Sequence, residues 1–225
     1  MSKDQKVSVI IRSKNEERWI GHAIQSVLDH IESPEIIIVD NHSSDETLAI
    51  ARSFQADPEL EQSHRFTEIK IISIEDYSPG KALNLGVQNA SHEYILILSS
   101  HCVIQTFNLT KHIEDSSKFA AIFGNQIPKY NGRTIKKRYL WNHFGDVEIV
   151  NMFSEMEERY FFHNALSFFK KDTLIQDSFN EMLTGKEDRY WAIDIINKNK
   201  DILYDPCMSA DHHYTANGNT WKGIG

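Results

Sequence analysis

The chain has 225 residues, with 24 Lys and Arg against 32 Asp and Glu, which gives a formal net charge of −8 at pH 7. The composition is that of an ordinary globular protein, and a chain of this length can bury a large core without disulfide or metal staples. The acidic surplus argues against nucleic acid as a partner and against binding of an anionic membrane through a broad face. From the chain length we expect a single domain over residues 1–225.

The cysteines and the apolar runs predict the compartment. Cys102 and Cys207 lie far apart and neither belongs to a CxxC pair, so no disulfide framework or zinc cluster is indicated. The N-terminus lacks a signal-peptide core, and no apolar run approaches the roughly 18 residues of a membrane span. These features predict a cytoplasmic protein. Peripheral contact with the inner face of a membrane, and the oligomeric state, stay open.

The first half of the chain alternates apolar runs of strand length with helical patterns. We expect strands at residues 7–11, 35–39, 68–74 and 93–98, and helices at residues 19–28, 47–54 and 81–90. Such alternation indicates an α/β fold with a mostly parallel central sheet and helices on both faces. In sheets of this kind ligands bind at the carboxyl ends of the strands, where the polar turns of this sequence fall.

The second half is less regular. We expect strands at residues 120–123 and 166–169, and helices at residues 153–162 and 188–197. A basic cluster, Arg133, Lys136, Lys137 and Arg138, fits either a solvated loop or contact with an anionic acceptor.

Neither a GxGxxG nor a GxxxxGK[ST] motif is present, which excludes the commonest nucleotide-binding classes. Four other segments follow one another along the chain: VSVIIRSKNE (residues 7–16), EIIIVDNHSSDET (35–47), GKALNLG (80–86) and FNEMLTGKEDRYW (179–191). Together, and in this order, they resemble the family 2 glycosyltransferases with the GT-A fold.

The resemblance implies an inverting glycosyltransferase that moves a sugar from a nucleotide-sugar donor to a glycan or lipid-linked acceptor, in bacterial surface polysaccharide or glycolipid synthesis. Residues from 7 to about 100 would bind the donor, and those from about 101 to 225 the acceptor. A non-catalytic sugar-nucleotide or glycan-binding module on a decayed transferase fold is the rival reading. The residues that would bind the donor are Arg12, Asn15, Glu16, Asp40, Asn41, Lys81 and Ser100.

Two substitutions depart from the family pattern. Asn41 stands where the family has a second Asp, which leaves the nucleotide base open. The family's Asp-x-Asp motif is replaced by Ser99-Ser100-His101-Cys102. His101, with His212 and His213, would then hold a divalent cation, and imidazole suits Mn²⁺ better than Mg²⁺. In the alternative, metal-independent site, protonated His101, Arg12 or Lys81 balances the phosphates.

The catalytic base is expected in the last of the four segments. Asp188 matches the family's catalytic carboxylate and would deprotonate the acceptor hydroxyl, while Glu187 supports the site or binds acceptor. Arg189 is predicted to bind acceptor, and Trp191 to stack on an acceptor sugar or to face the core. Without the resemblance, Glu187 and Asp188 read as acids that favour a helix start.

Overall fold

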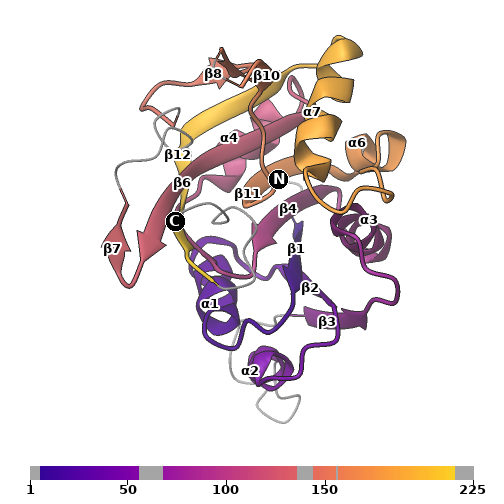
Figure 1. Cartoon of the computed structure of the whole chain (residues 1–225), viewed down its shortest axis with the longest axis vertical. Coiled ribbons are helices and arrows are strands. Elements are labelled where there is room, and N and C mark those ends of the chain that lie inside the picture. The colour runs from indigo at the N-terminus through magenta and orange to yellow at the C-terminus, as the bar shows by residue number, and fades with distance from the viewer. Residues whose placement is uncertain (1–5, 56–67, 136–143, 156, 216–225) are drawn as a thin grey trace, which may run out of the picture.

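A computed structural model of the chain describes residues 6–55, 68–135, 144–155 and 157–215. Its described part is organised around one large sheet whose strands run in the order β3-β2-β1-β4-β11-β6-β12-β5 (Figure 1). The strands of this path are β1 (Val7–Ser13), β2 (Glu35–Asp40), β3 (Glu68–Ser73), β4 (Tyr94–Ser99), β5 (Cys102–Thr106), β6 (Ala121–Tyr130), β11 (Leu166–Lys170) and β12 (Ile202–His213).

Strands β1 to β4 form the parallel half of the sheet. Ile10 of β1 pairs with Ile37 of β2 on one side and with Ile97 of β4 on the other. The central strands β1, β2 and β4 are largely apolar because both faces of the sheet are covered there, whereas β3 at the edge is only partly buried. The expected parallel arrangement is therefore confirmed for the first half, and each expected strand there lies within a residue or two of its predicted bounds.

The other half of the sheet is mixed. β11 lies antiparallel between β4 and β6, whereas β12 runs parallel to β6 and antiparallel to β5. The register of β12 shifts between Asp205 and Ser209, where a Cβ on Gly124 would come within 2.3 Å of the Met208 carbonyl oxygen. Glycine at that position lets β6 and β12 approach. Two short strands, β7 (Arg133–Thr134) and β8 (Ile149–Val150), extend the edges of β6 and β12.

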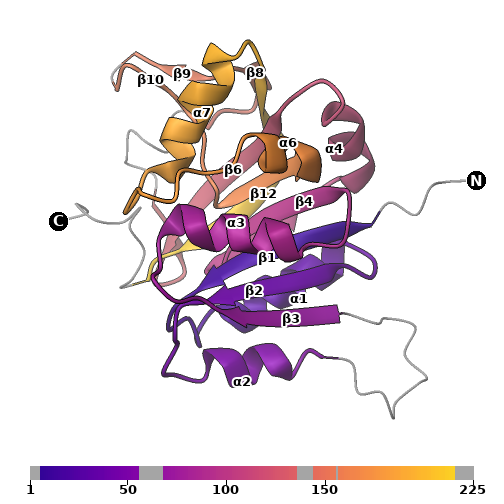
Figure 2. The same cartoon turned by 90° about the vertical axis from the view of Figure 1, so that its right-hand side faces the viewer.

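Helices cover both faces of the sheet, as expected (Figure 2). One apolar cluster joins one sheet face to α1, α2 and α4, and a second joins the other face to α3, α6 and α7. The strands of both sequence halves share this sheet, so the described part of the chain is a single α/β domain. The helices are α1 (Ile20–His30), α2 (Thr47–Arg52), α3 (Pro79–Asn89), α4 (Leu109–Asp115), α6 (Lys171–Gln176) and α7 (Glu187–Asn197).

The prediction of a helix at residues 153–162 is wrong. The segment forms two short antiparallel strands, β9 (Phe153–Ser154) and β10 (Arg159–Tyr160). The chain turns back at Glu158, which adopts a left-handed φ of 50°. Phe153 and Tyr160 pair across the strands with ring centroids 5.2 Å apart, a contact that stabilises strand pairing.

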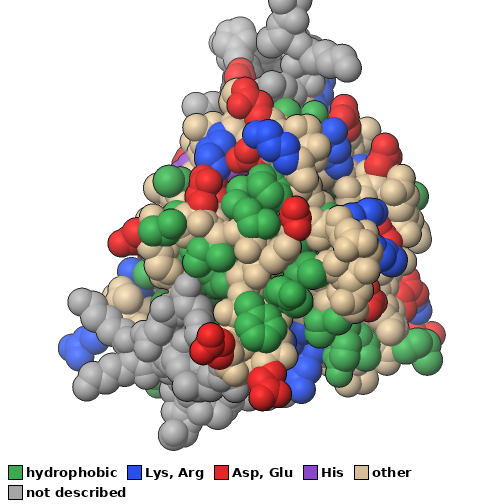
Figure 3. Space-filling view, turned by 90° about the horizontal axis from the view of Figure 1, so that it is seen from above, with side chains coloured by type: hydrophobic (Ala, Val, Ile, Leu, Met, Phe, Trp, Pro, Cys, Tyr) green, Lys and Arg blue, Asp and Glu red, His purple; other side chains and the backbone are tan. Residues whose placement is uncertain are grey.

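One end of the molecule exposes apolar side chains. Val147, Ile149, Val150 and Phe153 are all exposed within a single stretch of chain around β8. Figure 3 looks onto this end and shows apolar side chains gathered among charged ones. Within the described residues, none of the helices combines the length and the apolar character that crossing a bilayer requires.

Candidate active site

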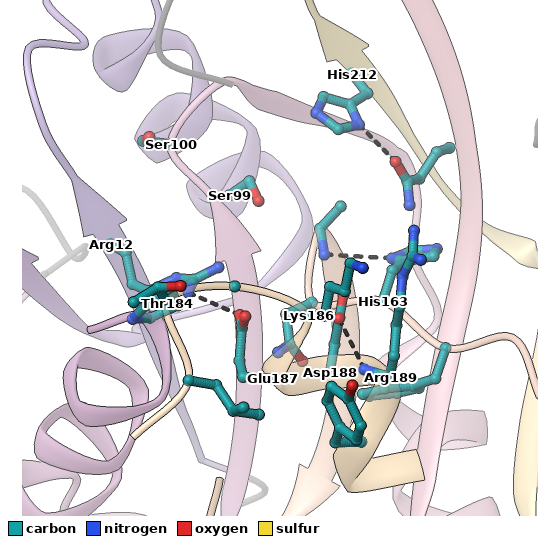
Figure 4. A pocket seen from close by; sticks show the side chains of 18 of the residues that line it. Arg12, Ser99, Ser100, His163, Thr184, Lys186, Glu187, Asp188, Arg189 and His212 are labelled. Atoms are coloured by element: carbon teal, nitrogen blue, oxygen red, sulfur yellow. Dashed lines mark hydrogen bonds and ion pairs between the residues drawn. The ribbon is translucent and has the colours of Figure 1, made fainter. Parts of the chain in front are cut away.

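A pocket of about 960 Å³ opens where the carboxyl ends of β1 and β4 meet the N-terminus of α7 (Figure 4). This volume is in the range of sites for small-molecule ligands. The pocket brings together side chains from both halves of the sequence. Of the residues predicted from the sequence, it is lined by Arg12, Glu16, Ser100, His101, Glu187, Asp188, Arg189 and His212.

Asp188 occupies the first turn of α7, with its Oδ1 accepting a hydrogen bond from the Arg189 backbone N–H at 2.8 Å. Burial, and then the neighbouring Glu187 carboxylate, raise the pKa of Asp188 to about 6. Arg12 and Arg189 oppose part of this rise. A carboxylate with a pKa near 6 is a stronger proton acceptor than an ordinary one and is still ionised at neutral pH.

Glu187 is tied to the sheet by Arg12. Arg12 Nη1 of β1 donates to Glu187 Oε1 at 2.9 Å, and the Glu187 carboxylate is buried (Figure 4). Burial alone would lower the pKa of Arg12, but Glu187, together with Tyr77 and Asp188, more than offsets burial and raises that pKa. The pair fixes the start of α7, and with it Asp188, against the end of β1.

The raised pKa of Asp188 predicts an acid limb in the pH profile. A general base must be deprotonated, so kcat/KM for sugar transfer should fall about tenfold per pH unit below about pH 6 and level off above it. The measurement is initial rate against pH at saturating metal. A profile that stays flat down to about pH 4.5, near the pKa of an unperturbed carboxylate, contradicts this assignment.

The GKALNLG segment, residues 80–86, holds residues 179–181 in place before the start of α7. Asn84 Nδ2 donates to the Phe179 carbonyl and to Glu181 Oε1, both at 2.9 Å, and Asn84 Oδ1 accepts from Phe179 N–H at 3.0 Å. A Cβ on Gly80 would come within 2.5 Å of the Asn180 carbonyl oxygen. The GKALNLG and FNEMLTGKEDRYW segments therefore pack against each other, and this contact positions the candidate base Asp188.

His101 and His212 face one another although they lie far apart in sequence. Their Nε2 atoms are 3.0 Å apart and their rings stack at 4.9 Å. The Nδ1 atom of His101 lies 3.3 Å from Glu16 Oε1, and that of His212 lies 2.5 Å from Gln126 Oε1. Carboxylate and amide oxygens only accept hydrogen bonds, so each Nδ1 carries the proton.

This tautomer suits a cation between the two rings. With Nδ1 protonated, the neutral His212 ring presents an Nε2 lone pair toward His101, and His101 presents one in return whenever its own Nε2 is unprotonated. Burial, followed by the charges of His101 and other histidines, lowers the pKa of His212 well below its usual value, so that ring is neutral. Two Nε2 atoms 3.0 Å apart are held together either by a proton between them or by a metal ion that lies off the line joining them. Two imidazoles that bind one ion at right angles would be separated by about 3 Å.

His101 and His212 thus fit as two ligands of a metal ion, with polar second partners of the usual kind. No cluster of three or more His, Cys, Asp or Glu side chains suited to a metal occurs in the described residues. His213, also predicted as a ligand, instead stacks on Trp19 with ring centroids 3.7 Å apart and does not line the pocket.

Four predicted donor-binding residues lie outside the pocket lining, at the neighbouring strand ends. Asn15 Oδ1 accepts from Ser44 N–H at 2.8 Å, and Asp40 Oδ1 accepts from Ser13 Oγ at 2.8 Å. Lys81 Nζ donates to the Glu75 carbonyl at 3.2 Å. Asn41, by its backbone N–H, donates to the Ser13 carbonyl at 2.9 Å. In this structure they stabilise the turns that follow β1 and β2 and the start of α3.

Trp191 belongs to the core. It is 3% exposed, its Nε1 donates to the Asp177 carbonyl at 2.6 Å, and its ring packs on Phe162, Phe169 and Phe179. The indole does not line the pocket, so the expectation that it stacks on an acceptor sugar is not met.

Several residues of the pocket were not anticipated, among them Gln126, Arg159 and His163. His163 Nε2 donates to the Gly124 carbonyl at 2.9 Å, and burial lowers its pKa to about 4, so the ring is neutral. These residues come from the irregular half, where periodicity carries little information about which side chains meet. Of the predicted basic cluster, Arg133 is exposed on β7, and residues 136–138 lie outside the described residues.

The fold is the GT-A type found in solved glycosyltransferases. S. aureus TarS in complex with UDP-GlcNAc superposes with a TM-score of 0.69 and 19% identity, over 98% of this chain and 62% of that one. GalNAc-T7 with UDP, GalNAc and Mn²⁺ gives a TM-score of 0.65 and 15% identity, over 95% of this chain and 44% of that one.

Residues 8–182 match the family described as glycosyl transferase family 2, and the chain belongs to that family. Over 191 residues it is 27% identical to the GalNAc(5)-diNAcBac-PP-undecaprenol beta-1,3-glucosyltransferase of Campylobacter jejuni, which covers 83% of this chain and 59% of that protein. It is 28% identical over 124 residues to the poly-beta-1,6-N-acetyl-D-glucosamine synthase of Staphylococcus epidermidis, which covers 53% of this chain and 28% of that protein. The chain spans less than two thirds of the length of these relatives.

Proposed function

We propose that this chain is an inverting glycosyltransferase, which moves a sugar from a nucleotide-sugar donor to a hydroxyl of a glycan or lipid-linked acceptor in bacterial polysaccharide or glycolipid synthesis. The observation that supports it best is the pocket carboxylate Asp188, whose pKa is raised to about 6. It shares that pocket with two facing imidazoles, His101 and His212. Family membership and the UDP-GlcNAc complex of TarS support a nucleotide-sugar donor.

The residues divide the reaction between two ends of the pocket. At one end, Asp188 accepts the proton of the acceptor hydroxyl while its oxygen attacks the anomeric carbon. At the other end, beside His101 and His212, the bond from that carbon to the diphosphate oxygen breaks. Attack and departure on opposite faces invert the anomeric centre. Arg12, through Glu187, holds the start of α7 so that Asp188 keeps its position.

His101 and His212 are the side chains that would hold Mn²⁺, which when bound supplies positive charge to the departing diphosphate. GalNAc-T7, a structural neighbour, was solved with Mn²⁺. Glu16 and Gln126 keep the two Nε2 lone pairs directed at one point. Ser100, which lines the same pocket, would donate a hydrogen bond to the diphosphate.

A donor screen separates this function from that of a non-catalytic binding module. We expect one of the UDP, dTDP, GDP or CMP sugars to raise the melting temperature with Mn²⁺ and to release free nucleotide slowly by hydrolysis. Binding without release above background, on addition of glycan and lipid-linked acceptors as well, favours the module. Stabilisation by no nucleotide contradicts the proposed function and a sugar-nucleotide-binding module alike, and leaves only a glycan-binding module.

Peripheral membrane contact by a cytoplasmic enzyme is part of the proposal. The Campylobacter relative is named for an undecaprenol-linked substrate, and this chain exposes Val147, Ile149, Val150 and Phe153 together. Co-sedimentation with vesicles of anionic and of neutral lipid measures this contact, and its absence from both pellets contradicts it.

A further inference from the structure

The end of the pocket that holds Asp188 also gathers three cationic side chains. Arg159 comes from β10, while Lys186 and Arg189 flank Asp188 at the start of α7, and all three line the pocket. Arg189 lies in the first turn of α7, and Lys186, which is exposed and has a left-handed φ of 63°, is the N-cap residue just before it. Figure 4 shows Lys186, Asp188 and Arg189 together, toward the opposite end of the pocket from His212.

Two of the three carboxylates near this cluster are each already paired with an arginine. Glu157 pairs with Arg159, and Glu187 pairs with Arg12 at 2.9 Å. Within the described residues, neither Lys186 nor Arg189 has a side-chain hydrogen bond or salt bridge. These two cations therefore share a single nearby carboxyl group, Asp188, whose proton affinity is itself raised.

Two features of this arrangement are unfavourable without a negative ligand. Arg159 is mostly buried, with its guanidinium 4.4 Å from the centre of the Phe161 ring, and burial and the adjacent Arg189 charge lower its pKa. Lys186 and Arg189 stand at a helix N-terminus, where the macrodipole disfavours positive charge. An anion at this position would relieve both effects.

The stereochemistry of the reaction says which substrate carries that anion. In a direct displacement the leaving diphosphate and the attacking hydroxyl lie on opposite faces of the anomeric carbon. The base lies on the side of the hydroxyl, so cations around Asp188 are on the acceptor side. The proposed function puts the donor diphosphate beside His101 and His212, toward the opposite end of the pocket, so it would not be their partner.

From these contacts we infer that the acceptor carries an anionic group, a phosphate or a carboxylate, within a few bonds of the hydroxyl that Asp188 deprotonates, and that Arg189 and Lys186 bind that group. Arg159 is a positioning residue, whose charge next to Arg189 adds to the positive potential at the anion site. The inference rests on the proposed function and specifies its acceptor class.

A matched set of small probes tests this inference by binding as well as by transfer. Glycerol, glycerate and glycerol 3-phosphate share a carbon skeleton and differ in charge. The protein is first saturated with Mn²⁺ and the nucleoside diphosphate that stabilises it most, which occupies the diphosphate site. We expect glycerate, glycerol 3-phosphate or both to bind at least roughly tenfold more tightly than glycerol. The better of the two identifies the group as carboxylate or phosphate.

Charge variants assign the effect to residues. Arg189→Gln and Lys186→Gln should each reduce the anionic advantage by roughly tenfold and leave affinity for the nucleotide unchanged, whereas Arg189→Lys should retain most of it. Lys118→Gln, which removes a 67% exposed cation away from the pocket, is the matched control. Equal binding of all three probes, or equal losses in the Lys118 variant, overturns the inference. Anion binding without sugar transfer by the wild type would instead contradict only the proposed function.

Discussion

Replacing Asp188 by Asn should reduce sugar transfer by about a thousandfold or more, because the amide cannot accept the proton of the acceptor hydroxyl. The replacement preserves the size of the side chain. Its Oδ1 can still accept the hydrogen bond from the Arg189 backbone N–H. The measurement is kcat with saturating donor and acceptor, together with the dissociation constant of the nucleotide.

Nucleotide affinity should change little in the Asp188→Asn variant, because Asp188 lies on the acceptor side of the pocket. The acid limb of the pH profile should disappear from any remaining activity. Glu187→Gln is the informative companion, since it weakens the ion pair with Arg12 without removing the base, and should cost less activity than Asp188→Asn. If Asp188→Asn turns over at a rate near that of the wild type, the base has been wrongly assigned.

The second large effect is expected at the two facing imidazoles. His101→Ala and His212→Ala should each lower Mn²⁺-dependent turnover by about a hundredfold or more. The double variant should be little worse than either single one, because one histidine alone no longer forms the site. Turnover is measured against Mn²⁺ concentration, with a chelator as the reference condition.

His213→Ala is the matched control for these variants. It removes an adjacent histidine of the same strand that stacks on Trp19 rather than facing His101, so its Mn²⁺ dependence should be that of the wild type. Turnover that is indifferent to both chelator and Mn²⁺ would favour the alternative in which a proton lies between His101 and His212. In that case activity should fall as pH rises through the pKa of the pair.

The parallel half of the fold was predictable because its central strands β1, β2 and β4 are buried on both faces and form apolar runs in the sequence. The turns that follow these strands lie at one sheet edge, which brings Arg12, Glu16, Ser100 and His101 to one place. Asp188 was found through the resemblance of its segment rather than through periodicity, because an acid at a helix start has a purely structural explanation as well.

The structure of residues 153–162, and the orientations of His212, His213 and Trp191, depend on tertiary contacts that the spacing of residues in the sequence does not encode. The aromatic residues of 153–162 fit a helix by spacing, yet the turn at Glu158 makes two strands and carries Arg159 to the pocket. His212 and His213 are adjacent in a strand, so their side chains point to opposite faces, and only His212 meets His101. Trp191 lies one turn inside α7, where packing on three phenylalanines decides its orientation.

The backbone link between His213 N–H and the His101 carbonyl, 3.0 Å long, joins the end of β12 to the start of β5. A ligand that needs both His101 and His212 binds only those protein molecules in which β12 is paired with β5. By mass action, occupancy of the site must then strengthen the pairing of β12, and amide hydrogen exchange along Ile202–His213 should slow as ligand is added. Donor binding and the pairing of β12 are therefore thermodynamically linked.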